Sequence, residues 1–455
     1  MPTFEYASLL DAAPGTVWAW HLRPGALERL TPPWEHVQVL RRSGGVADGG
    51  TVELRIGQGP LARRWVARHR DAVAPRGFVD EQVEGPFASW VHEHRFEPAD
   101  AGRTRMLDRI TYAPPFGAAG ALADSLLIRR RLQRTFRYRH ATVAEDLGSH
   151  RRADLPPLTV AITGASGLLG TALTHFLATG GHVVRPLVRR QAGPGEVSWD
   201  PATGTIDRAA LEGVDAVVHL AGENIGMGRW NPDRKRRIRE SRVVGTGLLA
   251  TTLAGLARKP RVLVSVSGVG IYGSRGDEPL TEASAPGSDF LAETGIAWEA
   301  AARPAADAGI RVVHPRFGMI LTPAGGGLAR MLPVFELGAG ARLGDGRQWM
   351  SWIGLDDALG LILHALATEA IAGPLNAAAP GAVTNRAFTE ILGEVLGRPT
   401  ILPAPAVALR IAFGEMADAL LLASQRVVPA RAGETGFVFR HPDLRGALRH
   451  LLGRD

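Results

Sequence analysis

Three glycines at intervals of three residues, Gly164, Gly167 and Gly170, lie between a short apolar run and the start of a helical pattern. In such a series the first glycine allows a tight turn, the second lets backbone N–H groups approach a pyrophosphate, and the third lets helix and strand pack closely. The helix N-terminus then presents its positive end to the phosphates. We therefore expect a dinucleotide site here rather than a purely structural turn. The residues predicted to contact the dinucleotide are Gly164, Ser166, Gly167, Leu168, Leu169 and Gly170.

Two arginines, Arg189 and Arg190, end the second predicted strand of this unit. A site for NAD(H) usually has an acidic residue at this point, where it binds the ribose 2′-hydroxyl. The next acidic residue in this sequence is Glu196, and two guanidinium groups suit a 2′-phosphate. The sequence therefore favours NADP(H) over NAD(H). The alternative is that both arginines lie in a solvated loop.

Small residues follow the third predicted strand, where the backbone can come close to a cofactor. The predicted contacts here are Leu220, Ala221, Gly222 and Glu223. Glu223 falls at the carboxyl end of the predicted sheet, where ligands of such sheets bind, although a helix N-cap contact is the alternative. Arg242 is a further candidate for a contact with the cofactor. His219 lies within the apolar strand and is expected to be a packed core residue.

Residues 158–455 resemble the extended short-chain dehydrogenases/reductases that are grouped as NAD-dependent epimerases and dehydratases. More narrowly, they resemble the atypical epimerase-family oxidoreductases that are sometimes called cell-division inhibitor homologues. The matching segments are Thr163–Gly170, Leu220–Asn224, Arg229-Trp230, Glu240–Arg242, Ser265–Gly273, Phe290, Trp298-Glu299, Gly344–Trp352 and Arg426–Phe439. The resemblance implies a Rossmann fold with an NAD(P) cofactor and oxidoreductase or epimerase chemistry.

Most enzymes of this class use a Tyr and a Lys, four residues apart on one helix, to move a proton while hydride passes to or from nicotinamide. The resemblance puts the Tyr position at Leu291 and the Lys position at Gly295, and no Tyr-x-x-x-Lys occurs in the chain. The usual proton relay is therefore absent. Ser267 and Tyr272 remain as catalytic candidates, and Ser267 is also a candidate cofactor contact. The alternatives are a capping role for Ser267 and a packing role for Tyr272.

Aromatic and titratable side chains alternate along three predicted strands in the first part of the chain. The residues that share a face are Trp90, His92, His94 and Phe96 on one strand, Met106, Asp108, Ile110 and Tyr112 on another, and Trp65, Ala67 and His69 on a third. If these faces turn inward, they line a ligand cavity that has a few polar contacts. A sheet with buried, hydrogen-bonded histidines is the alternative. His92 and His94 lack a clear third ligand, so no metal site is predicted.

This layout and the run Leu30-Thr31-Pro32-Pro33-Trp34 resemble the START-like ligand-binding domains of the SRPBCC superfamily over roughly residues 1–145. The resemblance implies an α+β helix-grip fold with a hydrophobic pocket between the sheet and the long final helix. We therefore expect a hydrophobic ligand in this domain.

The elements that must position these residues fall into three segments. Residues 1–147 are predicted to form an α+β domain of two short helices, antiparallel strands and a long closing helix. Residues 157–386 alternate short apolar strands with helices, which predicts an α/β Rossmann domain with a parallel sheet. Residues 387–455 are predicted to form a small, mostly helical region on the substrate side. The polar stretch 145–157, which contains Pro156 and Pro157, separates the first two segments.

Composition narrows the classes of function. There are no cysteines among the 455 residues, which excludes disulfides, thiol catalysis and cysteine metal sites. The formal net charge of +7 is spread over both parts, and the basic runs 129–139 and 233–242 are predicted to be solvated helix faces. Neither a nucleic acid nor a membrane is therefore an expected partner. No signal peptide or membrane-spanning stretch is apparent, so we expect a soluble, cytoplasmic protein.

Two functions are compatible with these residues. The first is an NADP(H)-dependent oxidoreductase or epimerase that acts on a small, hydrophobic molecule. The second is a non-catalytic protein that senses NADP(H) and regulates a partner, possibly one in cell division. The first is preferred, because hydride transfer does not strictly require the missing tyrosine.

Overall fold

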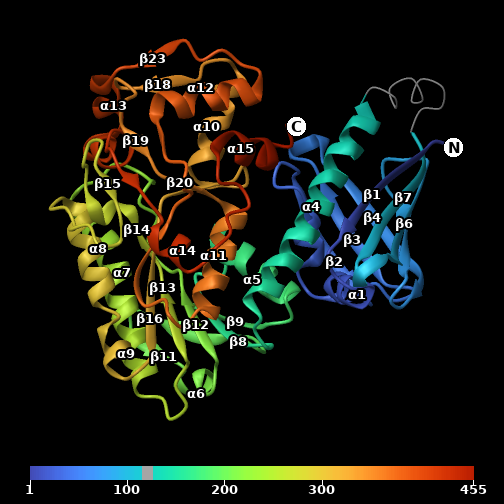
Figure 1. Ribbon diagram of the computed structural model, residues 1–455, viewed down its shortest axis with the longest axis horizontal. Helices are drawn as coiled ribbons and strands as arrows, with labels where there is room; N and C mark the ends of the chain where they lie inside the picture. Colours follow the sequence, from blue (N-terminus) through green and yellow to red (C-terminus); the bar gives the residue numbers. More distant parts are fainter. Residues whose placement is uncertain (115–126, 455) are drawn as a thin grey trace. The chain divides into compact units, whose positions relative to one another are not determined.

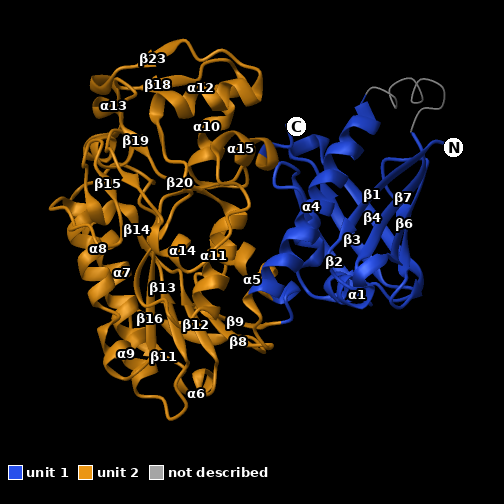
Figure 2. Ribbon diagram, in the orientation of Figure 1, with its two compact units in different colours: residues 1–152, 178–181, 452–455 blue, residues 153–177, 182–451 orange. Residues whose placement is uncertain are grey.

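The chain forms two compact units in the computed structural model, which describes residues 1–114 and 127–454 (Figure 1). Figure 2 colours the two units separately. The first unit comprises Met1–Arg152, Ala178–Gly181 and Leu452–Asp455, and the second comprises Ala153–Leu177 and His182–Leu451. Each unit has its own sheet and its own hydrophobic core.

The first unit is built on a seven-stranded antiparallel sheet in the order β1-β7-β6-β5-β4-β3-β2. Its strands are β1 (Thr3–Leu10), β2 (Val37–Ser43), β3 (Thr51–Ile56), β4 (Arg63–Val73), β5 (Gly77–Glu84), β6 (Ser89–Pro98) and β7 (Thr104–Ala113). Two short helices, α1 (Pro14–Leu22) and α2 (Ala26–Leu30), follow β1, and the long α4 (Arg129–Ala153) packs on the sheet (Figure 1). This is the helix-grip arrangement that the sequence predicts.

One apolar stripe holds the long helix α4 against the sheet. Leu132, Phe136, Val143 and Leu147 recur at helical spacing and are buried in the core. Because Leu147 continues this stripe, α4 extends through most of the polar stretch 145–157 that was expected to separate the first two segments. The helix ends at Ala153.

The second unit is built on a largely parallel sheet, in which the strands follow the order β10-β9-β8-β12-β13-β16-β21. These strands are β8 (Thr159–Thr163), β9 (Val183–Val188), β10 (Val197–Asp200), β12 (Ala216–His219), β13 (Val262–Ser265), β16 (Arg311–Phe317) and β21 (Gly373–Ala377). Two short strands complete it, β11 (Thr205–Ile206) beside β10 and β14 (Ser267–Gly268) beside β16. The chain runs outward from β8 in both directions, so the switch point of this Rossmann sheet lies between β8 and β12.

Helices cover both faces of this sheet. Alternate residues of β8 point to opposite faces, since Val160 and Ile162 belong to one core and Ala161 to the other. The helices of the second unit are α5 (Leu168–Thr179), α6 (Arg208–Leu211), α7 (Pro232–Ala254), α8 (Phe290–Ala300), α9 (Arg303–Asp307), α10 (Gly326–Glu336) and α11 (Leu355–Ala367). Side chains of α5 and α11 fill the first core, and side chains of α7 and α9 fill the second. The sheet is therefore buried on both faces, as parallel sheets usually are.

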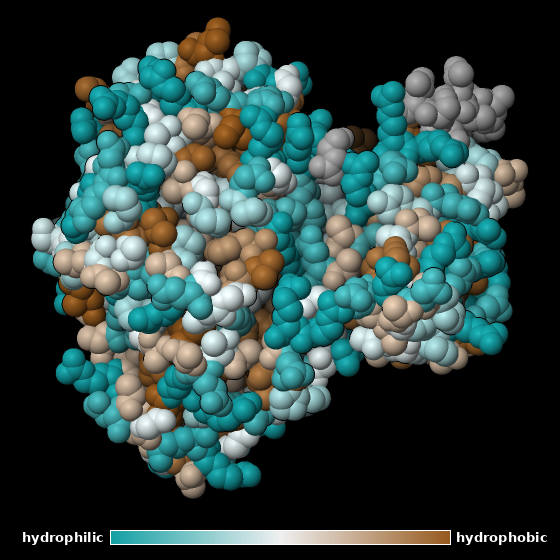
Figure 3. Space-filling view, in the orientation of Figure 1, coloured by the Kyte–Doolittle hydropathy of each residue, from teal (hydrophilic) through white to brown (hydrophobic). Residues whose placement is uncertain are grey.

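The last part of the second unit is mostly helical, as predicted. Its helices are α12 (Asn385–Leu396), α13 (Ala406–Phe413), α14 (Ala430–Glu434) and α15 (Leu444–Leu452), and short paired strands of two or three residues link it to the preceding loops. In the space-filling view, apolar side chains are scattered among hydrophilic ones (Figure 3). Within the described residues, no helix combines the length and the apolar character needed to cross a bilayer.

Candidate functional site

The glycine turn joins β8 to α5 beside the end of β12. Gly164 has a φ of +67°, and a Cβ atom there would lie 3.0 Å from the backbone nitrogen of Ala221. A Cβ atom at Gly170 would lie 2.1 Å from the carbonyl oxygen of Gly164, so the glycine allows α5 to begin directly against the turn. Ser166, Gly167 and Leu168 are exposed at the tip of the turn. The backbone thus has the close approach and the open tip that a pyrophosphate site requires.

A buried chain of hydrogen bonds fixes the neighbouring end of β12. The Thr163 hydroxyl accepts hydrogen bonds from the backbone N–H groups of Leu220 (3.0 Å) and Ala221 (3.2 Å) and lies 2.7 Å from His219 Nδ1. His219 Nε2 is 2.9 Å from the Thr246 hydroxyl of α7. Burial lowers the pKa of His219 to about 4, in agreement with a packed core residue. Neither threonine could be assigned this role from the sequence, because only the fold brings the two hydroxyls beside His219.

Glu223 and Arg242 lie beside Gly222, just beyond β12. The backbone N–H of Glu223 donates to Ser241 Oγ at 3.0 Å, and its carboxylate pairs with Arg234, a residue that sequence reasoning missed. A Cβ atom at Gly222 would lie 3.4 Å from the guanidinium carbon of Arg242. The structure therefore brings both predicted charged residues to the carboxyl edge of the sheet.

Arg189 and Arg190, directly after β9, have different surroundings. Both arginines are exposed. Arg190 donates two hydrogen bonds to Glu196, at 2.7 and 2.5 Å. Arg189 has no hydrogen bond or ion pair with the part of the chain that the structure describes. Of the two arginines predicted to bind a 2′-phosphate, only Arg189 therefore has no carboxylate partner among the described residues.

Tyr272 ends the short helix η4 (Val269–Tyr272) and is fully buried. Its hydroxyl donates to Asn376 Oδ1 at 2.7 Å and accepts from Arg316 Nη1 at 2.9 Å. Arg316 in turn pairs with both carboxylate oxygens of Glu299, each at 2.8 Å. Burial raises the pKa of the Tyr272 hydroxyl, although Arg316 opposes that shift. A packing role, the alternative for Tyr272, accounts for all of these contacts.

Ser267 lies in β14 and is buried, and its hydroxyl has no hydrogen-bond partner within the described chain. Ser265 in β13 and Thr294 in α8 also have buried hydroxyls without a described partner. Buried hydroxyls are normally hydrogen-bonded, so an unpaired one near a ligand site is free to bind that ligand. Of the two predicted catalytic residues, only Ser267 has a free functional group.

Close packing occupies the two positions where the family usually has Tyr and Lys. Both positions lie on α8, which contacts η4. Leu291 lies against Gly270, where a Cβ atom would be 3.3 Å from the leucine Cβ. A Cβ atom at Gly295 would be only 3.0 Å from the Cβ of Ile271. The missing relay is therefore replaced by direct contact between the helix and the turn.

The first unit contains a cavity of about 780 Å³ in which sheet residues face α4. Apolar lining residues include Leu30, Val52, Leu54, Trp65, Phe87, Trp90, Leu132 and Phe136, and polar ones include His21, His69, Asp80, His92, His94 and Arg139. The predicted inward face of β4 lines this space, as do Trp90, His92 and His94 of β6, whereas Phe96 of the same β6 face is buried in the core. The predicted face of β7 is also buried, but it packs behind the lining.

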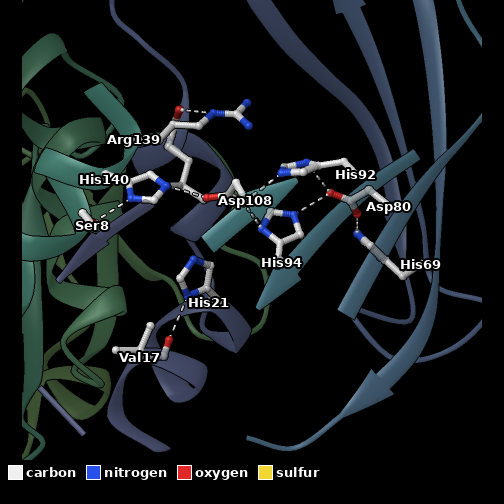
Figure 4. A network of polar contacts seen from close by, with 11 residues as sticks. Ser8, Val17, His21, His69, Asp80, His92, His94, Asp108, Arg139 and His140 are labelled. Carbon is white, nitrogen blue, oxygen red and sulfur yellow. Dashed lines mark hydrogen bonds and ion pairs between the residues drawn. The ribbon is translucent and has the colours of Figure 1, made fainter. Parts of the chain in front are cut away.

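A polar network crosses the wall of this cavity (Figure 4). Asp108 accepts hydrogen bonds from His92 Nε2 (2.8 Å) and His140 Nε2 (2.6 Å) and lies 2.8 Å from His94 Nδ1. Burial lowers the pKa of His94, but Asp108 and Asp80 outweigh it and raise that pKa to about 9. Burial likewise works against ionisation of Asp108, yet the histidines hold its pKa well below the usual range.

Comparison with known families assigns three segments of the chain. The family described as NAD dependent epimerase/dehydratase matches residues 160–378. The family described as polyketide cyclase/dehydrase and lipid transport matches residues 10–140. A domain of unknown function matches residues 404–451.

Individual relatives match over most of their own length. An epimerase family protein of Mycobacterium bovis is 44% identical over 298 residues, which are 65% of this chain and 98% of that protein. The human epimerase family protein SDR39U1 is 37% identical over 298 residues, which are 65% of this chain and 100% of that protein.

Two solved structures resemble the chain. The nucleoside-diphosphate sugar epimerase from Corynebacterium glutamicum has a TM-score of 0.80 and 36% identity, and the match covers 99% of this chain and 90% of that one. Human SDR39U1, solved with NADPH, has a TM-score of 0.60 and 35% identity, with 65% and 99% covered. The chain therefore belongs to the NAD-dependent epimerase/dehydratase family, as an extended short-chain dehydrogenase/reductase fused to an N-terminal SRPBCC domain.

Proposed function

We propose that the chain binds NADP(H) between the carboxyl ends of β8 and β12 and acts as an oxidoreductase or epimerase on a small, hydrophobic molecule. The observation that carries this proposal is the glycine turn at the switch point of the sheet. Gly164 and Gly170 have no room for a Cβ atom, and the exposed tip of the turn leaves its backbone N–H groups accessible to a phosphate. The human relative that was solved with NADPH supports the same cofactor.

Arg189 is the residue that we expect to select NADP(H). Its exposed guanidinium follows β9, where the ribose of a bound dinucleotide lies in this fold. Arg190 is already paired with Glu196, so it offers less to a 2′-phosphate. A hydrogen bond to a charged group contributes about 1.5–3 kcal/mol. That range corresponds to roughly 10- to 150-fold in affinity.

Titration of the purified protein with NADPH and NADH tests this assignment. Arg189→Ala should weaken NADPH binding at least tenfold and leave NADH binding nearly unchanged. Arg190→Ala is the matched control and should change NADPH binding less than threefold. A wild type that prefers NADH contradicts the NADP(H) proposal. The same conclusion follows from an Arg189→Ala, Arg190→Ala double variant that keeps the wild-type preference.

Catalysis without the usual relay must use other groups of this chain. A bound NADP(H) would supply or accept the hydride. We expect Ser267 to hydrogen-bond the reacting oxygen of the substrate, because its buried hydroxyl is unpaired within the described residues. Ser267→Ala should then lower kcat by about 10²-fold or more. Assays should use NADPH with a panel of carbonyl compounds and nucleotide sugars, since a solved relative is named as a nucleoside-diphosphate sugar epimerase.

The alternative function is a non-catalytic sensor of NADP(H) that regulates a partner, such as one in cell division. The contact between Gly295 and Ile271 favours the sensor, because this contact fills a position where the family usually has a catalytic lysine. Tight NADPH binding without turnover across the whole panel would favour the sensor. NADPH oxidation that Ser267→Ala abolishes would favour the enzyme.

We further propose that the cavity of the first unit holds a hydrophobic ligand. Its wall combines leucine and aromatic side chains with a few polar groups, which is typical of small-molecule sites. Leu54 and Leu132 line this wall from β3 and α4. Leu54→Arg should reduce binding of an apolar fluorescent probe, whereas the same change at the exposed Leu9 should not.

A further inference from the structure

Three side chains of the N-terminal cavity converge with atoms that bind metal ions. Asp80, His92 and His94 each offer one ligand atom, and these atoms lie within 4.8 Å of one another. Asp80 Oδ2 is 3.0 Å from His94 Nε2 and 3.6 Å from His92 Nδ1. Ligand atoms at the tetrahedral bond lengths of Zn²⁺ are roughly 3.3 Å apart. The two separations from Asp80 are therefore close to those around a bound ion, which would replace the hydrogen bond between Asp80 and His94.

The sheet itself holds these three residues in place. Asp80 of β5 is paired with His92 of the neighbouring β6, and His94 lies two residues further along β6 on the same face. The three side chains all line the cavity. Ligands on adjacent strands of one sheet keep their geometry better than ligands on loops.

Each of the three residues has an outer partner that orients it. Asp108, on the far side of the histidines, lies 2.8 Å from His92 Nε2 and 2.8 Å from His94 Nδ1. His69 Nε2 lies 2.7 Å from the other oxygen of Asp80, Oδ1. Metal-binding histidines usually have this kind of carboxylate behind them, because it fixes the ring and leaves the opposite nitrogen for the ion. Asp108 is not itself part of the cavity lining, so it has the position of an outer partner.

The charges of this cluster suit a bound cation. A neutral imidazole has one N–H, yet His92 and His94 each lie between two carboxylates, Asp80 and Asp108. Figure 4 also draws Arg139, whose guanidinium is one of the polar groups that line the cavity. Two buried carboxylates and one guanidinium leave one negative charge without a counter-ion unless a proton or a metal ion supplies it.

We propose that Asp80, His92 and His94 form a binding site for a divalent transition-metal ion, with Zn²⁺ as the preferred ion. Two imidazole nitrogens and one carboxylate oxygen match the three protein ligands of catalytic zinc sites, which keep a fourth position open. Here the open position faces the cavity. A cavity ligand that carries an oxygen donor, such as a carbonyl, phenol or carboxylate, completes the coordination, while its apolar part contacts the leucine and aromatic wall. The same ligand set also binds Fe²⁺, so both ions are used in the test.

Metal titration of the full-length protein tests the site. After treatment with a chelator and its removal, the wild type should bind one equivalent of Zn²⁺, Fe²⁺ or Co²⁺ with micromolar or tighter affinity. Co²⁺ should give visible absorption bands, since its d–d transitions report a low coordination number. Asp80→Asn should weaken Zn²⁺ binding at least 100-fold because it replaces a charged ligand. Asp108→Asn should weaken it about 10- to 100-fold, because the histidines lose their outer partner.

His21→Gln is the matched control. His21 lines the same cavity, with its ring centroid 6.3 Å from that of His94, but it lies outside the group of converging ligand atoms and its Nδ1 is hydrogen-bonded to the Val17 carbonyl. The His21→Gln variant should keep a Zn²⁺ affinity within threefold of that of the wild type. Circular dichroism checks that every variant is folded.

The wild type alone can also decide the question. X-ray absorption of the Zn²⁺-loaded protein should show nitrogen and oxygen ligands with scattering from two imidazole rings. If the wild type does not bind one equivalent of Zn²⁺ with a Kd below about 10 µM, protons supply the positive charge of the cluster and the proposal is overturned. Equal affinity in folded Asp80→Asn would do the same, as would a spectrum without two imidazoles.

Discussion

The hydroxyl groups of Thr163 and Thr246 decide which nitrogen of His219 carries the proton. Thr163 Oγ1 already accepts two backbone N–H groups, so its own proton points to His219 Nδ1. The ring proton must then be on Nε2, which donates to Thr246. Trp298 Nε1 donates to the same Thr246 hydroxyl at 3.0 Å. A protonated His219 would lose the bond from Thr163, which is a second reason, besides burial, for a neutral ring.

The first prediction concerns the titration of His219. Because its folded pKa of about 4 is below the value of about 6.5 for an unfolded histidine, the neutral ring stabilises the fold above pH 6.5. This contribution is lost as the pH falls from 6.5 towards 4, and the loss at pH 5 is about 2 kcal/mol. Histidine NMR should show no titration of His219 between pH 7 and 5. Protein unfolded in urea is the control and should titrate near 6.5. A midpoint near 6.5 in the folded protein contradicts the prediction.

The second prediction separates a structural role of Tyr272 from a catalytic one. Tyr272→Phe removes the hydroxyl that links Arg316 to Asn376 and should reduce the free energy of unfolding by about 1–3 kcal/mol. Tyr6→Phe is the control, because the Tyr6 hydroxyl has no hydrogen bond to the described residues. It should change stability by less than about 0.5 kcal/mol. Urea unfolding measures both. Unchanged stability together with lost turnover would instead assign catalysis to Tyr272.

At the scale of elements, the contact between α5 and the glycine turn depends on a missing side chain. Gly170→Ala would put a Cβ atom 2.1 Å from the Gly164 carbonyl oxygen, so the helix must shift. The expected loss of stability is about 1–3 kcal/mol or more. Gly247→Ala, in the middle of α7, is the control, because a Cβ atom there meets nothing within 4 Å. It should stabilise the helix by roughly 0.5–1 kcal/mol. Thermal unfolding of the two variants should move in opposite directions.

The types of most elements could be predicted from the sequence, because the apolar residues that show the periodicity are the same residues that become buried. The strand–helix rhythm after Pro157 and the glycine turn both correspond to the observed Rossmann unit. The third metal ligand could not be predicted in the same way. Asp80 is 12 residues before His92, and only the register of β5 with β6 brings the two together. Its one signal in the sequence is that it shares a strand face with Phe78.

Sequence reasoning also could not assign partners to charged side chains. Arg189 and Arg190 are identical in type and adjacent in the chain, yet only Arg190 is paired with Glu196. That difference depends on how the loop after β9 folds back. The polar stretch 145–157 is a similar case, since the packing of Leu147 extends α4 through residues whose composition is typical of a loop.

For the whole molecule, the separate hydrophobic cores of the two units predict two separable unfolding transitions. Trp20, Phe96 and Val143 belong to the core of the first unit, whereas Ile162 and Leu249 belong to cores of the second. A ligand at 100 times its Kd stabilises its own unit by about 2.7 kcal/mol. Calorimetry should therefore show Zn²⁺ raising one Tm by roughly 5–10 °C and NADPH raising the other by several degrees. A single transition that both ligands shift equally contradicts this prediction.

The contact of Gly295 with Ile271 also limits how this protein can evolve. A lysine at position 295 would bring its Cβ within 3.0 Å of the isoleucine Cβ, so Ile271 or α8 must shift to accommodate it. A lysine at position 295 alone therefore lowers stability, whereas a lysine combined with a smaller residue at position 271 avoids the overpacking.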